Sequence, residues 1–278
     1  MATPRPITFL SDYGYEDEFA GVCRAVIAQI ASGAPLIDLS HGITRQDVRQ
    51  GAIALANALP SCPPGVHLAV VDPGVGSPRR AVGVAAAEGR YLVGPDNGLL
   101  SRALDRLGGA LEAVELSRSP FRFEPVSATF HGRDLFAPVA AHLSLGARLD
   151  EAGEPIDPGS LAALDLPVPR IASDEVTAHA IHADGYGNVT LNLDASMLTD
   201  GPLRQGERFE VRAPDGRFEA LWARTFADVG PGDVLLFTDS SGALALAVSG
   251  GSAAGLLNLE RDSEVTLRPQ KGSGRAVA

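Results

Sequence analysis

Hydrophobic positions follow different patterns in the two halves of the chain. In the first half, short apolar runs alternate with segments in which apolar residues recur every three or four positions, as along one face of a helix. The runs predict strands, and the periodic segments predict helices. This alternation, from residue 7 to residue 145, is typical of an α/β fold, here a three-layer αβα domain with a mostly parallel sheet.

The apolar run over 66–71 lacks period-2 alternation, so it predicts a strand buried on both faces, as in a parallel sheet. Thr44 and Asp47 match a capping box in its Asp variant, which predicts the start of a helix. Gly33 and Pro60 are expected to end the first and second helices. The elements expected in this half are strands over 7–10, 35–39, 66–71, 81–87 and 91–93, and helices over about 19–32, 44–59, 99–107 and 134–145.

Past about residue 165 the pattern changes to short strands separated by turns rich in Gly, Asp and Asn. This pattern predicts a small all-β domain, a barrel or a sandwich. We therefore expect an α/β domain over 1–166, a short connection, a β domain over 171–268 and a disordered tail over 269–278. The strands expected in the second domain cover 176–183, 189–193, 208–211, 234–238, 243–248 and 264–267.

The composition excludes several classes of protein. A net charge of −11 argues against a nucleic-acid partner, which requires a basic face. No apolar run approaches the roughly 20 residues needed to span a bilayer, so no membrane partner is expected. The first six residues contain no apolar signal core, which predicts a cytoplasmic protein. Two cysteines are too few for a disulfide framework.

The segment Asp-Pro-Gly-Val-Gly-Ser-Pro-Arg over 72–79 is the strongest candidate for chemistry. Asp72 follows the buried strand at its carboxyl end, where open α/β sheets bind their ligands. Gly74 and Gly76 allow a close backbone approach, and Arg79 returns a positive charge seven residues after the carboxylate. An ordinary turn with a solvated Asp and Arg is the alternative, because turns favour these residue types.

Other polar clusters follow expected strands, over 11–17, 184–188 and 239–242, and one precedes an expected helix, over 130–133. Carboxylates in such positions suit a ligand that carries hydroxyl groups and a positive charge. The chain has no Gly-x-Gly-x-x-Gly after its first strand and no Walker loop, so no phosphate-bearing cofactor is indicated. It also lacks His-x-x-x-His, Cys-x-x-Cys and Gly-x-Ser-x-Gly, so we expect neither a metal site nor a serine nucleophile.

Six short segments, taken in order along the chain, form one pattern. They are Phe-Leu-Ser-Asp-Tyr-Gly over 9–14, Val-Val-Asp-Pro-Gly-Val-Gly over 70–76, Gly-Pro-Asp-Asn-Gly over 94–98, Thr-Phe-His-Gly-Arg-Asp over 129–134, Asp-Gly-Tyr-Gly-Asn over 184–188 and Ser-Ser-Gly over 240–242. This pattern resembles the S-adenosyl-L-methionine (SAM) hydroxide adenosyltransferases, relatives of the fluorinase and chlorinase. The resemblance implies hydrolysis of SAM to adenosine and L-methionine, with SAM as the substrate and no cofactor. It also implies a homotrimer, with each site between one subunit's N-terminal domain and a neighbour's C-terminal domain.

The resemblance assigns the handling of water to Asp72, Arg79 and His131. Gly132 stands where the halogenases carry a Ser that holds the halide, so the resemblance favours hydrolysis over halogenation. A halide-dependent transferase on the same fold is the first alternative. A SAM or adenosine binding module without catalysis is the second, although the trio would have no clear purpose in such a module.

The same resemblance assigns substrate contacts to both domains. Asp12 corresponds to the carboxylate that binds the ribose hydroxyls, and Asn188 to the residue that reads the adenine edge. Ser241 stands where the halogenases carry an Arg. The remaining expected contacts are Asp17 and Asp184 near the amino-acid end of the ligand, the aromatic residues Phe130, Tyr186 and Phe226, and Ser240 at the methionine carboxylate.

Overall fold

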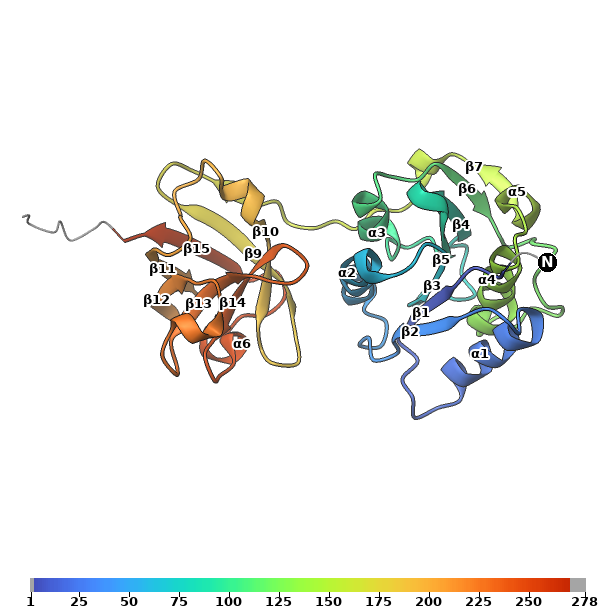
Figure 1. Cartoon of the computed structure of the whole chain (residues 1–278), viewed down its shortest axis with the longest axis horizontal. Helices are drawn as coiled ribbons and strands as arrows, with labels where there is room; N and C mark the ends of the chain where they lie inside the picture. Colours follow the sequence, from blue (N-terminus) through green and yellow to red (C-terminus); the bar gives the residue numbers. More distant parts are fainter. Residues whose placement is uncertain (1–2, 271–278) are drawn as a thin grey trace, which may run out of the picture. The chain divides into compact units, whose positions relative to one another are not determined.

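The computed structural model describes residues 3–270, and the chain divides into two compact units, Met1–Leu164 and Asp165–Ala278 (Figure 1). In Figure 1 the first unit runs from blue to yellow-green and the second from yellow to red. Each unit has a hydrophobic core of its own. They are described separately below.

The N-terminal unit is built on a seven-stranded sheet with the order β2-β1-β3-β5-β4-β6-β7. The first four strands in this order pair in parallel, and the last three join by antiparallel pairing. Five of the seven strands therefore run in one direction. The bounds are β1 Ile7–Ser11, β2 Leu36–Ser40, β3 Val66–Val70, β4 Ala81–Ala86, β5 Arg90–Pro95, β6 Glu112–Glu115 and β7 Glu154–Ile156.

Helices cover both faces of this sheet, so the three-layer prediction is confirmed (Figure 1). Alternate residues of β1 show why: Phe9 joins the core beneath α1 and α4, whereas Leu10 joins the core beneath α2 and α3. The carboxyl ends of β1 and β3 thus open at one edge of a sheet that is covered on both sides. The helices are α1 Phe19–Ile30, α2 Val48–Ala58, α3 Ser101–Arg106, α4 Ala137–Ser144 and α5 Leu149–Ala152.

Some local expectations for this unit are wrong. The expected capping box does not form: Asp47 caps α2 by accepting from the backbone N–H of Gln50 at 3.0 Å, while Thr44 donates its own N–H to the Gln50 side chain. The helix expected over 134–145 begins earlier, with a π-helical turn over Gly132–Phe136. The short elements β6, β7 and α5 were not predicted, because three or four residues carry too little periodicity to read.

The C-terminal unit is a barrel in which seven strands close through pairing of β9 with β10. The expected strands are all present, and the barrel, one of the two architectures predicted, is confirmed. The short β8 and the charged β12 were missed. The bounds are β8 Arg170–Ile171, β9 Val176–Ala183, β10 Val189–Asp194, β11 Arg208–Ala213, β12 Gly216–Trp222, β13 Val234–Thr238, β14 Ala243–Val248 and β15 Glu264–Pro269, with a short helix α6 at Ala253–Leu256.

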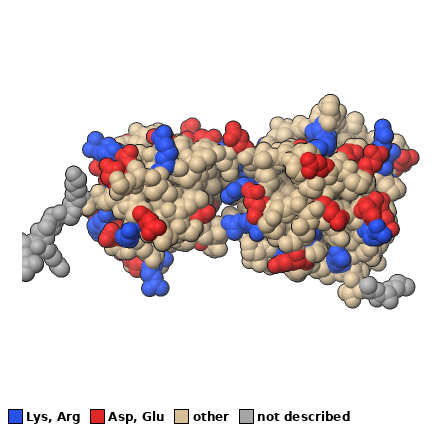
Figure 2. Space-filling model, turned by 90° about the horizontal axis from the view of Figure 1, so that it is seen from above, with Lys and Arg blue, Asp and Glu red and all other residues tan. Residues whose placement is uncertain are grey.

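The disordered tail expected over 269–278 falls largely outside the described residues, and Pro269 belongs to β15. On the face shown in Figure 2, basic and acidic side chains are interspersed. Within residues 3–270, no helix has both the length and the apolar character needed to cross a membrane.

Candidate functional site

The loop after β3 folds back so that Arg79 meets Asp72. Gly76 has φ +77°, and a Cβ at this position would lie 2.7 Å from the carbonyl oxygen of Ala128. Glycine therefore allows this loop to pack against the segment that leads to His131. A hydrogen bond from the N–H of Ser77 to the carbonyl of Gly74, at 3.0 Å, tightens the turn.

The trio Asp72, Arg79 and His131 forms one hydrogen-bonded assembly. The Nε of Arg79 donates to Oδ1 of Asp72 at 2.7 Å, and its Nη2 pairs with Oδ2 of the same carboxylate. The same Nη2 lies 3.0 Å from Nδ1 of His131. The side chains of Asp72 and Arg79 are only 7% and 10% exposed. The alternative of a turn with a solvated Asp and Arg is therefore wrong.

This geometry fixes the tautomer of His131. A guanidinium group donates hydrogen bonds and accepts none, so Nδ1 of His131 is the acceptor and the neutral ring carries its proton on Nε2. Burial and the adjacent Arg79 lower the pKa of His131, which keeps the ring neutral at pH 7. Among the three side chains, the carboxylate of Asp72 therefore keeps lone pairs that can accept a hydrogen bond from a ligand.

Asp12 lies at the carboxyl end of β1, and its Oδ2 accepts a hydrogen bond from the backbone N–H of Gln46 at 2.8 Å. Burial raises the pKa of Asp12, and the nearby Asp72 carboxylate raises it further. Asp17 is more exposed and lies 3.5 Å from Nη2 of Arg45. The two expected substrate carboxylates of this unit therefore have different surroundings, one half-buried and one near the surface.

Gly132 has no room for a side chain, because a Cβ there would overlap the hydroxyl of Tyr13. Burial raises the pKa of the Tyr13 phenol well above its usual value, so this hydroxyl stays protonated. The ring of Phe130 packs edge-on against Tyr13 at 5.8 Å and against Phe19 at 5.2 Å. The contacts of Phe130 thus shape one wall of the site.

Five of the expected residues line one cavity of about 230 Å³. Arg79 is not among them, but it bonds to two of the five, Asp72 and His131. The cavity is smaller than the roughly 300–1,000 Å³ of typical ligand sites. Its lining consists of Asp12, Tyr13, Asp17, Phe19, Arg45, Gln46, Asp72, Val75, Thr129, His131 and Gly132.

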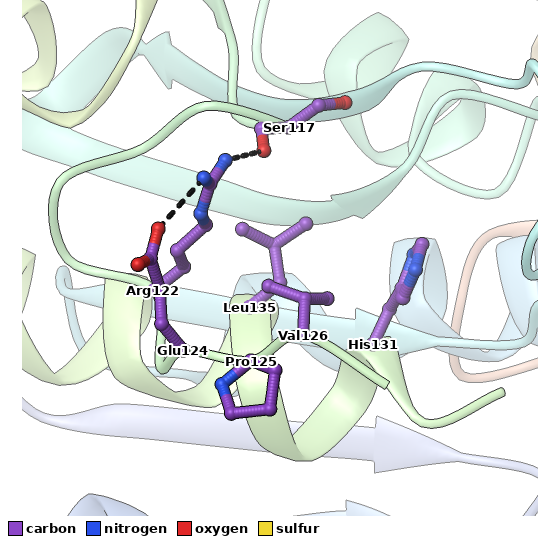
Figure 3. A pocket seen from close by; sticks show the side chains of 7 residues that line it. All are labelled: Ser117, Arg122, Glu124, Pro125, Val126, His131 and Leu135. Atoms are coloured by element: carbon purple, nitrogen blue, oxygen red, sulfur yellow. Dashed lines mark hydrogen bonds and ion pairs between the residues drawn. The ribbon is translucent and has the colours of Figure 1, made fainter. Parts of the chain in front are cut away.

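His131 also lines a second cavity of about 620 Å³ (Figure 3). Its polar side is occupied by Arg122, which pairs with Glu124 at 2.9 Å and with the carbonyl of Ser117. Figure 3 shows Val126 and Leu135 between this ion pair and His131. The second cavity is therefore an amphipathic space beside the imidazole, in which the charges of Arg122 and Glu124 are paired with each other.

In the C-terminal unit, Asp184, Tyr186 and Asn188 lie on the turn between β9 and β10. Oδ1 of Asp184 accepts from the N–H groups of Tyr186 and Asn188, both at 2.9 Å, and its Oδ2 accepts from the Asn188 amide at 2.9 Å. Tyr186 is 85% exposed. Gly187, with φ +83°, lets this turn pack on Ser252, whose Oγ a Cβ would overlap.

Ser240 and Ser241 lie on the turn between β13 and β14, which is distant from the turn between β9 and β10. Pairing of β10 with β14 shows this directly: Val189 pairs with Leu246 and Asp194 with Ala243, so the two turns flank opposite ends of β14. These ends lie roughly 17 Å apart at the usual rise of a strand. The six C-terminal candidates therefore do not form a single cluster.

The turn between β13 and β14 lies near a pair of aromatic rings and is stabilised by internal hydrogen bonds. The ring of Phe226 packs at 5.1 Å against Phe237, near this end of β13. Oδ1 of Asp239 accepts from the N–H and hydroxyl of Ser241 at 2.8 and 2.6 Å. Phe226 is thus placed with Ser240 rather than with Tyr186.

Sequence reasoning missed six of the residues that line the cavity, among them Tyr13 and Gln46. Tyr13 belongs to a segment already singled out, but only the structure shows its hydroxyl against Gly132. Gln46 acts through its backbone N–H and has φ +65°, for which the sequence carries no signal. Within the described part of the chain, no group of three or more His, Cys, Asp or Glu residues is arranged to hold a metal ion.

Comparison with known proteins identifies the family. The model of the SAM hydroxide adenosyltransferase N-terminal domain matches residues 7–153, and that of the C-terminal domain matches residues 178–266. The chain belongs to the SAM hydroxide adenosyltransferase family. The resemblance read from the six sequence segments is thereby confirmed.

Relatives within this family carry two kinds of name. The (R)-S-adenosyl-L-methionine hydrolase of Salinispora tropica is 47% identical, covering 93% of this chain and 96% of that protein. A fluorinase from an Actinoplanes species is 28% identical, covering 94% of this chain and 96% of that protein. The crystal structure of an uncharacterized conserved protein from Thermotoga maritima has a TM-score of 0.88 at 33% identity, covering 94% of this chain and 99% of that one.

Proposed function

We propose that this protein hydrolyses SAM to adenosine and L-methionine by attack of water at C5′. The observation that carries the proposal is the hydrogen-bonded assembly of Asp72, Arg79 and His131, in which the Asp72 and Arg79 side chains are almost fully buried. It occurs in a chain of the SAM hydroxide adenosyltransferase family, close in sequence to proteins named SAM hydrolase.

The chemistry requires a nucleophile and no general acid. In SAM the C5′ carbon bears a sulfonium, so methionine leaves as a neutral thioether when the C5′–S bond breaks. The oxygen of water forms the new bond to C5′, and one proton is released. The task of the site is to align a water molecule with the C5′–S bond and to take its proton.

Each member of the trio has a distinct role in this proposal. Asp72 accepts the proton of the attacking water, a contribution typically worth about 10²- to 10⁴-fold. Arg79 fixes the Asp72 carboxylate with two hydrogen bonds, and its charge favours the developing hydroxide. His131 holds the water through its Nε2–H, because its Nδ1 is occupied by Arg79.

Substrate binding is proposed to involve both kinds of domain. Asp12 binds the ribose hydroxyls, and Asp17 lies near the amino-acid end of SAM. The small volume of the N-terminal cavity and the exposed ring of Tyr186 support a site that another surface completes. We propose a homotrimer in which a neighbouring copy supplies that surface. Its contacts are Asp184, Tyr186, Asn188, Phe226, Ser240 and Ser241.

Halide-dependent transfer has less support than hydrolysis. The halogenases place a halide-binding Ser where this chain has Gly132, and the hydroxyl of Tyr13 leaves no room for a side chain there. The proposed reaction is tested by incubating the pure protein with SAM in halide-free buffer and in buffer with added chloride. Equal formation of adenosine and methionine in both buffers supports hydrolysis. A 5′-chloro product, or no turnover without chloride, contradicts it.

A further inference from the structure

Close to the proposed ribose carboxylate lies a chain of buried polar side chains that the mechanism does not use. His41 is completely buried, and its Nδ1 lies 2.7 Å from the hydroxyl of Ser11, the residue before Asp12. Its Nε2 lies 3.3 Å from Oδ1 of Asp38, and the other oxygen of that carboxylate pairs with Arg24. Three side chains from β1, β2 and the loop after β2 thus meet in one row.

The groups on either side of His41, Asp38 and Ser11, indicate where the hydrogens in this row lie. The Asp38 carboxylate, paired with Arg24, lies 3.3 Å from Nε2 of His41 without forming a hydrogen bond, and its negative charge favours the tautomer that carries the hydrogen on Nε2. Nδ1 of His41 then accepts, and the hydroxyl of Ser11 donates to it. A lone pair of the Ser11 oxygen accepts in turn from the N–H of Tyr13 at 3.3 Å. Burial lowers the pKa of His41, in keeping with a neutral ring.

The row joins the two loops that form this edge of the cavity. The carbonyl of His41 accepts the N–H of Gly14 at 2.7 Å, and five residues later Gln46 donates its N–H to Asp12. The imidazole also packs edge-on against Phe9 at 4.6 Å and Tyr15 at 5.1 Å. The turn that carries Asp12 is therefore bonded on both sides to the loop that begins at His41.

We infer that His41 is a positioning residue for Asp12, holding through Ser11 the turn that presents this carboxylate to the ribose hydroxyls of the ligand. The inference rests on the proposed function, which assigns the ribose contact to Asp12. Contacts with the ribose are present in the ground state and in the transition state alike. Disturbing the turn therefore raises the KM for SAM and leaves kcat nearly unchanged.

Two substitutions separate positioning from packing. In His41→Asn the amide oxygen replaces Nδ1, so it accepts from Ser11, but no N–H group faces Asp38. In His41→Gln the amide nitrogen replaces Nε2, so an N–H group still faces Asp38, but the acceptor for Ser11 is lost. Positioning through Ser11 predicts about a tenfold higher KM for His41→Gln and a smaller rise for His41→Asn, with kcat within about threefold of wild type.

A structural role alone predicts the opposite order, because Gln fills the buried space of His better than Asn does. Melting temperatures and circular dichroism of both variants monitor folding. His67→Asn is the matched control: His67 is also buried and bonded to Thr8, but the two residues lie near the amino ends of β3 and β1, whereas Ser11 and Asp12 lie at the carboxyl end of β1. It should lower the melting temperature without changing the KM for SAM.

Binding of the product gives a readout that does not depend on catalysis. Calorimetry compares adenosine with 2′,3′-dideoxyadenosine, which lacks both hydroxyls that Asp12 binds. Wild type should prefer adenosine by roughly tenfold or more, since hydrogen bonds to a charged group are strong. In His41→Gln this preference should shrink toward unity, while affinity for the dideoxy compound stays within about threefold of wild type.

The outcomes distinguish the two proposals. If wild type neither turns over SAM nor binds adenosine, the proposed function fails. If wild type does both, but folded His41→Gln keeps its KM and its preference for adenosine, the positioning role of His41 is refuted. An equal loss of affinity for adenosine and for 2′,3′-dideoxyadenosine in His41→Gln would also refute this role, because the loss would then not depend on the ribose hydroxyls.

Discussion

The candidate residues of the two units are held in place in different ways. In the N-terminal unit, Arg79 and His131 are 52 residues apart in sequence and bond directly inside the fold. In the C-terminal unit, Asp184 and Asn188 are four residues apart and bond within one exposed turn. A preorganised assembly suits catalysis of a chemical step, whereas exposed turns suit the binding of a ligand from solution.

The difference has an electrostatic side. Asp72 and Arg79 are almost fully buried, so each depends on the other for compensation of its charge. Tyr186 is 85% exposed, and Asp184 bonds to its own turn rather than to a distant element. Substitutions in the first group should therefore change kcat, and those in the second should change KM. The following predictions test this contrast, from the largest expected effect to the smallest.

Asp72→Asn should have the largest effect. The substitution keeps the size of the side chain and removes the proton acceptor, so kcat should fall by about 10³-fold. SAM should still bind, because the proposed ribose and adenine contacts remain. Single-turnover kinetics and calorimetry measure the two quantities separately. Loss of SAM binding from a folded variant, with unchanged turnover of whatever binds, would show that Asp72 is a binding residue instead.

Acid should destabilise the N-terminal unit more than the C-terminal unit. Burial, together with Arg90, lowers the pKa of His67 to about 4, while an unfolded chain titrates near 6.5. Between these values the unfolded chain binds a proton that the folded chain does not. Stability therefore falls as the pH drops from about 6.5 to about 4, by about 3 kcal/mol in total. Urea unfolding at a series of pH values measures this slope.

The control for this prediction is His67→Asn, which cannot titrate in this range. The variant should have a lower stability at pH 7 and a shallower dependence on pH below 6.5. Among the described residues, the fully buried histidines, His41 and His67, belong to the N-terminal unit. An unchanged slope in the variant would assign the acid sensitivity to other groups.

Gly132→Ala should reduce activity by about tenfold or more, because its methyl group overlaps the Tyr13 hydroxyl and displaces the segment that carries His131. Tyr13→Phe should restore part of the loss in the double variant, since the ring carbon nearest the new methyl group lies 3.1 Å away. Gly185→Ala is the matched control on the other unit, where an added Cβ would have no atom within 4 Å outside Gly185 and its two chain neighbours. Equal effects of the two alanines would contradict the close-packing argument.

Tyr186→Ala should have the smallest effect on the chemical step. Stacking of an aromatic ring on a base is worth about 1–3 kcal/mol, so the KM for SAM should rise by about tenfold with little change in kcat. Because the ring is exposed, the melting temperature should stay the same. A fall in kcat at unchanged KM would break the proposed division between chemistry and recognition.

The sequence predicted much of the fold because its signals are local. The bounds of β9, β13 and β14 match the expected ranges, since alternating or continuous apolar runs end at clear turns. The sequence also singled out Asp72 and Arg79, seven residues apart after a buried strand, as the strongest candidates for chemistry. These features require no knowledge of distant contacts.

What the sequence did not predict depends on register and on backbone geometry. The opposite placement of the turns around Tyr186 and Ser240 follows from the pairing of β10 with β14, which no local pattern reveals. The bond between Gln46 and Asp12 depends on a positive φ at a residue other than glycine. The row from Asp38 through His41 to Ser11 joins two strands and a loop, so it becomes visible only in three dimensions.

The most direct test of the central claim is a labelling experiment. Wild type and Asp72→Asn are incubated with SAM in halide-free buffer made with ¹⁸O-water, and the products are analysed by mass spectrometry. The account predicts adenosine labelled at its 5′ oxygen and unlabelled methionine from wild type, and almost no adenosine from the variant. Unlabelled adenosine, or labelled adenosine formed equally fast by the variant, would contradict it.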